Sequence, residues 1–251
     1  MTLYDLRDKV AIITGSGRGI GRAIAIRLAM EKTKVVINAK RGVEEAVETV
    51  ERIKQIGGEA IYVISDVSTR EGCKKLVDKA FEVFGRIDIL VNNAGVGLYA
   101  LFKDLDEQLL EKQISADFRS VVYCSQEALR YMREDSVIVN IASLAGIKPL
   151  YGTSIYNAMK AAVIQLTKSM ALELAERRVR VFSVAPGFVR TKMGLSYFKV
   201  LNIDPDEWAE KHTLIKRLID PEEVAELVVS LIKIPSFVGE TVIIDGGASL
   251  I

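Results

Sequence analysis

The sequence predicts one doubly wound α/β domain over residues 1–251, with a mainly parallel seven-stranded sheet and helices on both faces. Seven runs rich in Val and Ile alternate with longer segments of helical periodicity. The runs are nearly all apolar, as expected for parallel strands buried on both faces. The first run leads into a glycine cluster and then a helix, which is how such folds commonly begin.

We expect strands at 10–14, 35–38, 60–65, 89–92, 137–142, 180–185 and 241–245, and helices at 21–32, 43–57, 69–85, 106–133, 154–178 and 221–233. Gly57, Gly58 and Gly85 are suitable helix stops, and Pro221 is a suitable helix start. One segment, 190–220, breaks the alternation and is mixed in character. Such a long connection predicts a partly helical lid over the substrate, with a simple surface insertion as the alternative.

Composition excludes several classes of protein. The chain has 34 basic and 33 acidic side chains, so its net charge of +1 offers no field for nucleic acid or a membrane surface. Cys73 and Cys124 lack metal-ligand spacing, and we expect them to be reduced and buried; a disulfide between them is the alternative. His212 is the only histidine, so we expect no histidine-based metal site. The chain enters its first strand without a leader, and no run has transmembrane length, so we expect a cytoplasmic protein.

The glycine cluster after the first strand predicts a nucleotide site. Glycines stand at 15, 17, 19 and 21, with Arg18 and Ile20 between them, and a helix follows. Glycine permits positive φ and close backbone approach, and the helix N-terminus offers free N–H groups to a phosphate. We therefore expect Gly15, Gly17, Gly19 and Gly21 to cradle a dinucleotide, with a tight structural turn as the alternative.

The end of the second strand favours NADP(H) over NAD. NAD enzymes place an acidic residue about twenty residues after the turn to bind the ribose 2′-hydroxyl. Here Ala39, Lys40 and Arg41 follow the strand with no acid, and Arg18 adds a cation. Cations without a carboxylate suit a 2′-phosphate, unless Lys40 and Arg41 are merely solvated loop charges. The missing acid also argues against a methyltransferase on a similar sheet.

The candidate catalytic residues are Ser143, Tyr156 and Lys160. Tyr156 and Lys160 stand four residues apart in a helical segment, so their side chains share a face. A nearby ammonium favours the phenolate, which would let Tyr156 give and take a proton near neutral pH. Ser143 follows an apolar run and could hydrogen-bond the same substrate oxygen. An exposed Tyr–Lys pair of no function is the alternative.

These motifs resemble those of the short-chain dehydrogenase/reductase family, whose members have a Rossmann-type fold. The resemblance covers 8–250 and rests on motifs in the family's order: Thr14-Gly15 with Gly19 and Gly21, Asn92-Asn93-Ala94-Gly95, the residues Ser143, Tyr156 and Lys160, Pro186-Gly187, and Asp245-Gly246-Gly247.

The resemblance implies further cofactor contacts. Tyr156 and Lys160 would also lie at the nicotinamide ribose. The remaining cofactor residues implied are Asp66 and Val67 near the adenine, Asn93, Ala94 and Gly95 after the fourth strand, and Pro186, Gly187, Val189 and Thr191 near the nicotinamide.

One position departs from the family pattern. Where the family often has a fourth catalytic residue, an Asn, this chain has Asp117. An ionised carboxylate only accepts hydrogen bonds, whereas an amide also donates. Asp117 could still hold a water that relays protons to Lys160, while its charge would weaken the effect of Lys160 on Tyr156.

The overall pattern most resembles 3-oxoacyl-(acyl-carrier-protein) reductases, which implies reduction of a 3-oxoacyl thioester on acyl carrier protein or CoA. A sugar or secondary-alcohol dehydrogenase and a non-catalytic NADP-binding regulator remain alternatives. The family also implies a homotetramer. Cations for an acidic carrier protein would be Arg130, Arg133, Arg177 and Arg178, unless these are ordinary helix-end charges. The expected substrate pocket is apolar, with candidates Val96, Leu98, Tyr99, Ile147, Leu150, Tyr151, Phe188, Met193, Leu195, Tyr197 and Phe198.

Overall fold

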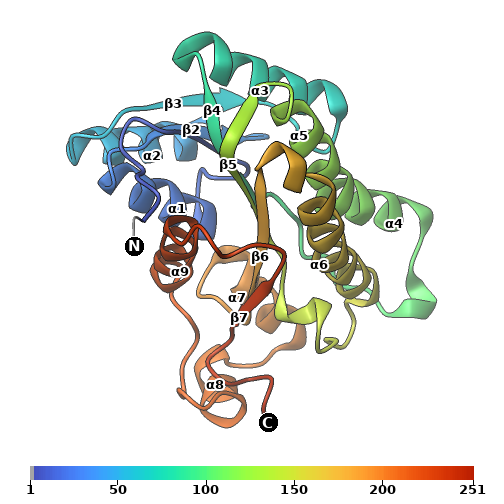
Figure 1. The fold of residues 1–251 in the computed structure, drawn as a ribbon. Coiled ribbons are helices and arrows are strands. Elements are labelled where there is room, and N and C mark those ends of the chain that lie inside the picture. The colour runs from blue at the N-terminus through green and yellow to red at the C-terminus, as the bar shows by residue number, and fades with distance from the viewer. Residues whose placement is uncertain (1–2) are drawn as a thin grey trace.

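Seven parallel strands form one sheet in the order β3-β2-β1-β4-β5-β6-β7, with helices on both faces (Figure 1). The computed structural model describes residues 3–251. This confirms the predicted fold class, and the sheet is wholly parallel. The strands are β1 (Val10–Ile13), β2 (Lys34–Ala39), β3 (Ala60–Ile64), β4 (Ile87–Asn92), β5 (Met132–Ile141), β6 (Arg180–Pro186) and β7 (Thr241–Ile244).

Successive residues of the strands enter two different cores, because side chains alternate across a pleated sheet. Ile13 packs in a cluster with residues of α1 (Gly19–Met30), α2 (Val43–Gln55) and α9 (Pro221–Lys233). Ile12 packs on the other face with residues of α3 (Arg70–Phe84), α5 (Ser120–Ala128) and α6 (Ser154–Glu173). Both isoleucines are fully buried, which explains why the strands are apolar throughout.

The sheet reverses its winding direction between β1 and β4. β1 pairs with β2 on one side and with β4 on the other, so the connections from these two strands leave toward opposite faces. In open α/β sheets ligands bind beyond the carboxyl ends of the strands at such a reversal, and we call this region, beyond β1 and β4, the crevice. The glycine turn and the Asn92–Gly95 segment both lie at these ends.

The predicted helix at 106–133 is wrong as a single element. It comprises α4 (Glu107–Ile114), a π-helical turn (Ser115–Arg119) and α5, and the chain is already in β5 from Met132. No glycine or proline stands between α4 and the end of β5, so the sequence carries no stop signal at either break. The predicted helix at 154–178 also ends early, with α6 followed by a 3₁₀ turn (Ala175–Arg177) and a reversal at Arg178, whose φ is 52°.

Other helix ends follow the predicted signals. α3 begins at a Thr69 cap, whose hydroxyl accepts from the Gly72 N–H, and ends at Gly85 with φ of 70°. α9 begins with Pro221, and the Glu223 side chain accepts from the Asp220 N–H. These local bonds fix where α3 and α9 begin.

The 190–220 excursion is partly helical, as predicted. It contains α7 (Lys192–Leu201) and α8 (Pro205–His212), and α8 lies below the sheet in Figure 1. A parallel bridge between Val189 and Ile219 joins the two ends of the excursion. Its interior is a small apolar cluster around the buried Phe198, with Trp208 packed against it.

The two cysteines are free and buried, in α3 and α5. Cys124 Sγ lies 2.8 Å from Cys73 Sγ, and burial together with this contact raises the pKa of Cys124 well above its usual value. Among residues 3–251, no helix is both long and apolar enough to cross a membrane. Two short 3₁₀ helices, Phe102–Asp104 and Leu144–Gly146, complete the described elements.

Candidate active site

The glycine turn meets two other chain segments in the crevice. Gly15 has φ of 62° and Gly19 has φ of 58°, a conformation that side chains rarely adopt. A Cβ on Gly15 would lie 3.0 Å from Ala94 Cα, and one on Gly19 would lie 3.3 Å from Thr191 Cγ2. The structure thus brings together residues that the sequence places far apart, and leaves a cradle lined by backbone.

Asn93 ties the fourth strand to the glycine turn. Its Nδ2 donates to the Thr14 carbonyl at 2.8 Å and to the Gly15 carbonyl at 3.2 Å. The Thr14 hydroxyl in turn accepts from the Asn93 and Ala94 N–H groups. The nearby Gly21 has no room for a side chain, because a Cβ would lie 2.5 Å from Asn93 Nδ2. These bonds hold the two strand ends in fixed register.

The expected 2′-phosphate cations have acidic neighbours. Arg18 pairs with Glu45 at 3.0 Å, and Lys40 pairs with Asp66 at 2.6 Å. Burial opposes ionisation of Asp66, but Lys40 and Ser68 outweigh it and lower the pKa of Asp66. Arg41 is exposed and has no acidic partner within 4.0 Å among the described residues. Ala39 and Val67 are buried beside these charges, and Ile20 and Gly17 line the turn.

The Lys160 side chain is buried against Tyr156, as the helical spacing predicted. Both residues lie in the first turns of α6, and Lys160 Nζ is 5.6 Å from the centroid of the Tyr156 ring. Lys160 is only 5% exposed, and its Nζ donates to the Ile141 carbonyl at 3.0 Å. Since Ile141 ends β5, this bond fixes the ammonium at the carboxyl end of the sheet.

Ser143 lies just beyond β5, two residues after Ile141. It caps the 3₁₀ helix, with its hydroxyl accepting from the Ala145 N–H at 3.1 Å. The hydroxyl proton remains available for another acceptor. Ser143 and Lys160 are therefore both anchored to the same strand end.

Asp117 is fully buried on the π-helical turn and faces Lys160. Its Oδ1 lies 3.5 Å from Lys160 Nζ and has no hydrogen-bond partner among the described residues. Its Oδ2 accepts from the Val96 N–H at 3.3 Å and from the Gln113 amide. Burial raises the pKa of Asp117, while the Lys160 charge and the two donors oppose that shift. A π-helical turn commonly marks a functional site, and here it turns a carboxylate toward the lysine.

The Pro186-Gly187 turn ends β6 and approaches β7. A Cβ on Gly187 would lie 2.9 Å from Asp245 Cα. Val189 is buried two residues further on, and the Thr191 hydroxyl caps α7 by accepting from the Gly194 N–H at 3.1 Å. The turn thereby places Thr191 beside Gly19 of the glycine cradle.

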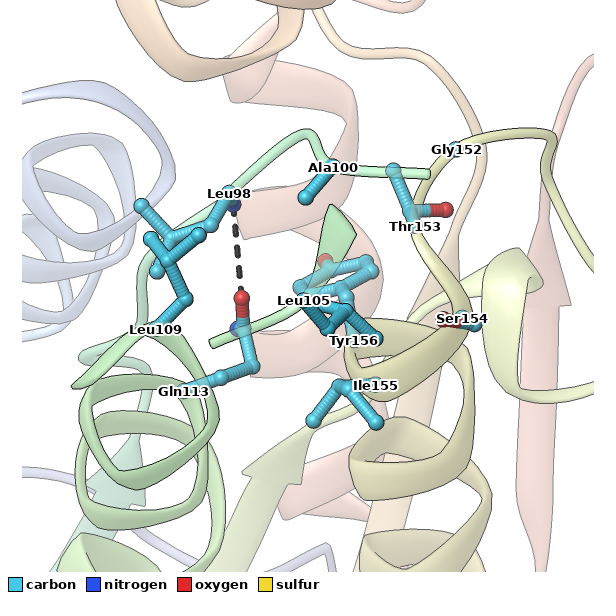
Figure 2. A pocket seen from close by; sticks show the side chains of 10 residues that line it. All are labelled: Leu98, Ala100, Leu105, Leu109, Gln113, Gly152, Thr153, Ser154, Ile155 and Tyr156. Carbon is cyan, nitrogen blue, oxygen red and sulfur yellow. Dashed lines mark hydrogen bonds between the residues drawn. The ribbon is translucent and has the colours of Figure 1, made fainter. Parts of the chain in front are cut away.

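A cavity lies between α4 and the start of α6 (Figure 2). Tyr156 lines it, and of the predicted substrate-pocket residues only Leu98 does so. Three other candidates belong to the apolar cluster around the excursion, namely Phe188, Leu195 and the buried Phe198. Tyr197 joins them, its hydroxyl donating to the Tyr151 carbonyl at 3.3 Å. Ile147, Tyr151 and Met193 are exposed, while Val96, Tyr99 and Leu150 are half-buried.

The four arginines considered for a carrier protein lie where β5 and β6 begin, at the amino ends of the strands. Arg133 is near the start of β5, about 20–25 Å along the strand direction from Ser143, because an irregularity shortens β5 between Met132 and Val137. Arg130 pairs with Glu127 at 2.8 Å, and Arg178 pairs with Asp135 at 3.1 Å. Arg177 donates to the Leu129 and Met132 carbonyls. Within one chain these cations therefore stabilise the junctions before β5 and β6 and do not face the crevice.

Sequence reasoning missed two groups of the site. Gln113 is 2% exposed and bonds Asp117, and the Ile141 carbonyl positions Lys160. The i, i+4 spacing of Gln113 and Asp117 was the available signal, but it required knowing that this face of α4 is buried. Among residues 3–251, no group of three or more His, Cys, Asp or Glu side chains could hold a metal ion.

Comparison with known proteins agrees with this geometry. Residues 9–200 match the family model described as short chain dehydrogenase. The chain is 34% identical to glucose 1-dehydrogenase 2 of Bacillus subtilis strain 168, over 98% of this chain and 96% of the relative. It is 31% identical to versicolorin reductase of Emericella nidulans, over 98% of this chain and 97% of that protein.

A solved structure shares the fold throughout. The short-chain dehydrogenase of Burkholderia cenocepacia J2315, crystallised in complex with NADP, has a TM-score of 0.90 and 33% identity over 98% of this chain and all of that one. The match to the family model, the relatives of similar length and the shared fold lead to one conclusion. This chain is an enzyme of the short-chain dehydrogenase/reductase family.

Proposed function

We propose that this protein is an NADP(H)-dependent oxidoreductase that interconverts a carbonyl and a hydroxyl group. The observation that carries the proposal is the buried Lys160 ammonium, held 5.6 Å from the Tyr156 ring. It lies at the carboxyl end of the sheet, where the glycine cradle also lies. A proton donor and a nucleotide cradle at one crevice are what carbonyl reduction requires.

The residues present fit a dinucleotide. A Cβ on Gly15 would lie 3.0 Å from Ala94 Cα and one on Gly19 would lie 3.3 Å from Thr191 Cγ2, so the glycines leave room for a pyrophosphate at the start of α1, while the buried Gly21 lets α1 pack against Asn93. Arg18, Lys40 and Arg41 would bind the 2′-phosphate, and Asp66 with Val67 would border the adenine. When bound, the nicotinamide supplies the hydride exchanged with the substrate carbon. The relative crystallised with NADP supports this cofactor choice.

The side chains of the site divide the remaining work. Tyr156 protonates the substrate oxygen as it becomes an alkoxide, and accepts the proton in the reverse direction. Lys160 favours the phenolate of Tyr156 by its charge, and would also bind the nicotinamide ribose. Ser143 donates its free hydroxyl proton to the same oxygen and stabilises the developing charge.

Pro186, Gly187, Val189 and Thr191 would complete the nicotinamide pocket, beside Asn93, Ala94 and Gly95. We propose that the segment 190–220 covers this pocket as a lid. Met193 supports this placement, because its Cγ lies 3.4 Å from where a Cβ on Gly97 would be. The start of α7 therefore lies over the segment that follows the Asn-Asn-Ala-Gly motif.

The substrate we propose first is a 3-oxoacyl thioester, because the closing motif 237–247 resembles that of the acyl-carrier-protein reductases. Apolar Leu98, Leu105 and Leu109 line the cavity beside Tyr156, but its volume of about 10 Å³ holds no more than a water, so an acyl chain would have to lie outside it. A CoA thioester fits one chain better than a carrier protein, since the four candidate arginines lie away from the crevice. The second candidate is a sugar or secondary alcohol, favoured by the similarity to a glucose 1-dehydrogenase.

NADPH oxidation with acetoacetyl-CoA, beside NADP reduction with a panel of aldoses and secondary alcohols, tests the proposal. We expect turnover with at least one substrate and none with the Tyr156→Phe protein. NADPH binding without turnover across the panel would favour a non-catalytic regulator. We also propose a homotetramer, supported by the exposed Leu172 on α6, and light scattering tests its mass.

A further inference from the structure

Gln113 joins three parts of the site through one buried amide. It lies on α4 and is 2% exposed, so its polar atoms need partners within the protein. Its Nε2 donates to the Val96 carbonyl at 2.7 Å and to Asp117 Oδ2, and its Oε1 accepts from the Leu98 N–H at 3.4 Å. Figure 2 shows Gln113 reaching from α4 toward Leu98, in the same cavity that Tyr156 lines.

Asp117 depends on these donors to carry a charge. A fully buried carboxylate is costly unless it is paired and hydrogen-bonded. Its three stabilising neighbours are the Val96 N–H, the Gln113 amide and the Lys160 ammonium. Its Oδ1 has no hydrogen-bond partner among the described residues but lies 3.5 Å from the Lys160 ammonium, and its Oδ2 accepts from two donors, so the contacts suit the ionised form. Loss of the Gln113 donor would remove one of the contacts that oppose the effect of burial, so the pKa of Asp117 would rise further.

Lys160 depends on Asp117 in the same way. Its Nζ is buried, and the structure gives it one hydrogen bond, to the Ile141 carbonyl, and one anionic neighbour, Asp117. The Tyr156 ring, on the same helix, lies 5.6 Å from the ammonium. The Asp117 charge therefore helps determine where the ammonium sits.

We propose that Gln113 is a positioning residue for Lys160 that acts through Asp117: its amide keeps Asp117 ionised beside the lysine. This inference rests on the proposed function, because it gives Lys160 a catalytic task. Gln113 and Asp117 then form one unit, with the carboxylate on the π-helical turn and its amide donor one turn earlier.

The charges around this unit are few. Lys160 on α6 is the cation within 4.0 Å of Asp117 among the described residues. Arg119, on the same π-helical turn, bonds Glu111 and Ser115 instead. The segment 95–98 contributes only backbone N–H and carbonyl groups here. Asp117 is thus the group whose titration should respond to Gln113.

The alternative is that Gln113 only anchors the 96–98 segment, through Val96 and Leu98. The two readings differ in a double-mutant cycle. If Gln113 acts through the carboxylate, replacing Asp117 by a neutral amide should make Gln113 dispensable. If Gln113 acts on the segment alone, its loss should cost as much in either background.

The experiment measures kcat/KM with NADPH against pH for wild type, Gln113→Leu, Asp117→Asn and the double variant. Gln108→Leu is the matched control, because Gln108 is an exposed glutamine on the same helix. We expect the fall in activity on the acid side to move up by about 1–2 pH units in Gln113→Leu, the effect of losing one hydrogen bond to a buried carboxylate. Asp117→Asn should lack that acid-side fall, and the double variant should match Asp117→Asn within about twofold.

Equal losses from Gln113→Leu in both backgrounds, or an unshifted profile in a folded Gln113→Leu protein, would overturn the inference. Active Asp117→Asn and inactive Tyr156→Phe in that same result would leave the proposed function intact.

A second readout needs no substrate. Because the folded-state pKa of Asp117 is raised, the folded protein holds a proton that the unfolded chain releases, and the free energy of unfolding falls as pH rises through this interval. We expect the free energy of unfolding of the wild type, measured relative to Asp117→Asn, to fall as pH rises. For Gln113→Leu, measured relative to the double variant, we expect a larger fall that extends to higher pH. Parallel curves would contradict the coupling even in a protein that reduces no carbonyl.

Discussion

Gly95 lies directly against the Asp117 carboxylate: a Cβ at Gly95 would overlap Asp117 Oδ1 and approach Lys160 Nζ to 3.6 Å. Gly95→Ala should therefore displace the carboxylate or the lysine, and lower kcat by about 10²-fold, the scale reported for small misplacements of catalytic groups. Gly97→Ala is the matched control, because its Cβ would meet only the flexible Met193 side chain at 3.4 Å. Steady-state kinetics on both variants, with far-UV circular dichroism for folding, checks this. Equal activity in the two proteins would contradict it.

Glu45 should weaken the preference for NADPH. It pairs with Arg18 at 3.0 Å, so a 2′-phosphate must compete with a carboxylate for that guanidinium. Glu45→Gln should tighten NADPH binding about two- to fivefold, as an exposed ion pair allows, and leave NADH binding unchanged. Fluorescence titration with both cofactors measures this.

Glu44→Gln is the control for charge, since Glu44 is exposed on the same helix and forms no ion pair among the described residues. If Glu44→Gln tightened NADPH binding as much as Glu45→Gln, the tighter binding would come from the loss of negative charge in general and not from release of Arg18. If Glu45→Gln improved NADH binding equally, the role of Arg18 at the 2′-phosphate would be wrong.

Glu223 should stabilise the fold in a pH-dependent manner. Its carboxylate bonds Arg217 and accepts from the Asp220 N–H, and these bonds lower its pKa to about 2. A depressed folded-state pKa gives stability above the ordinary carboxyl range that disappears as pH falls toward 2. At pH 7, Glu223→Gln should cost about 0.5–1 kcal/mol, the usual scale of helix capping and exposed ion pairs. Urea unfolding at several pH values tests this, and a similar loss in the neighbouring Glu222→Gln would refute it.

Most of the fold could be predicted because its signals are local. Strands such as Val10–Ile13 are apolar throughout, and Pro221 and Gly85 mark helix ends by their backbone requirements. The junction between α5 and β5 could not be predicted, because Arg130 and Tyr131 suit a helix or a strand and no glycine or proline separates the two elements. The chain becomes a strand at this point because it pairs with β4, which is a long-range interaction.

The site divides in the same way. The spacing of Tyr156 and Lys160 sufficed to place them on one helix face. The Gln113–Asp117 pair, and the carboxylates beside Arg18 and Lys40, depend on how α4, α2 and β3 approach their neighbours. Such approaches are set by packing, and the sequence pattern of a single element does not contain them.

The central claim is that Tyr156 is the acid in carbonyl reduction, supported by Lys160. Its most direct test is turnover by Tyr156→Phe with NADPH and the best substrate of the panel, beside NADPH binding by the same protein. Phenylalanine keeps the ring that packs near Lys160 and removes only the hydroxyl. We predict that kcat falls by roughly 10²–10⁴-fold while the NADPH dissociation constant changes less than about threefold. Turnover near the wild-type rate in that variant would contradict the account.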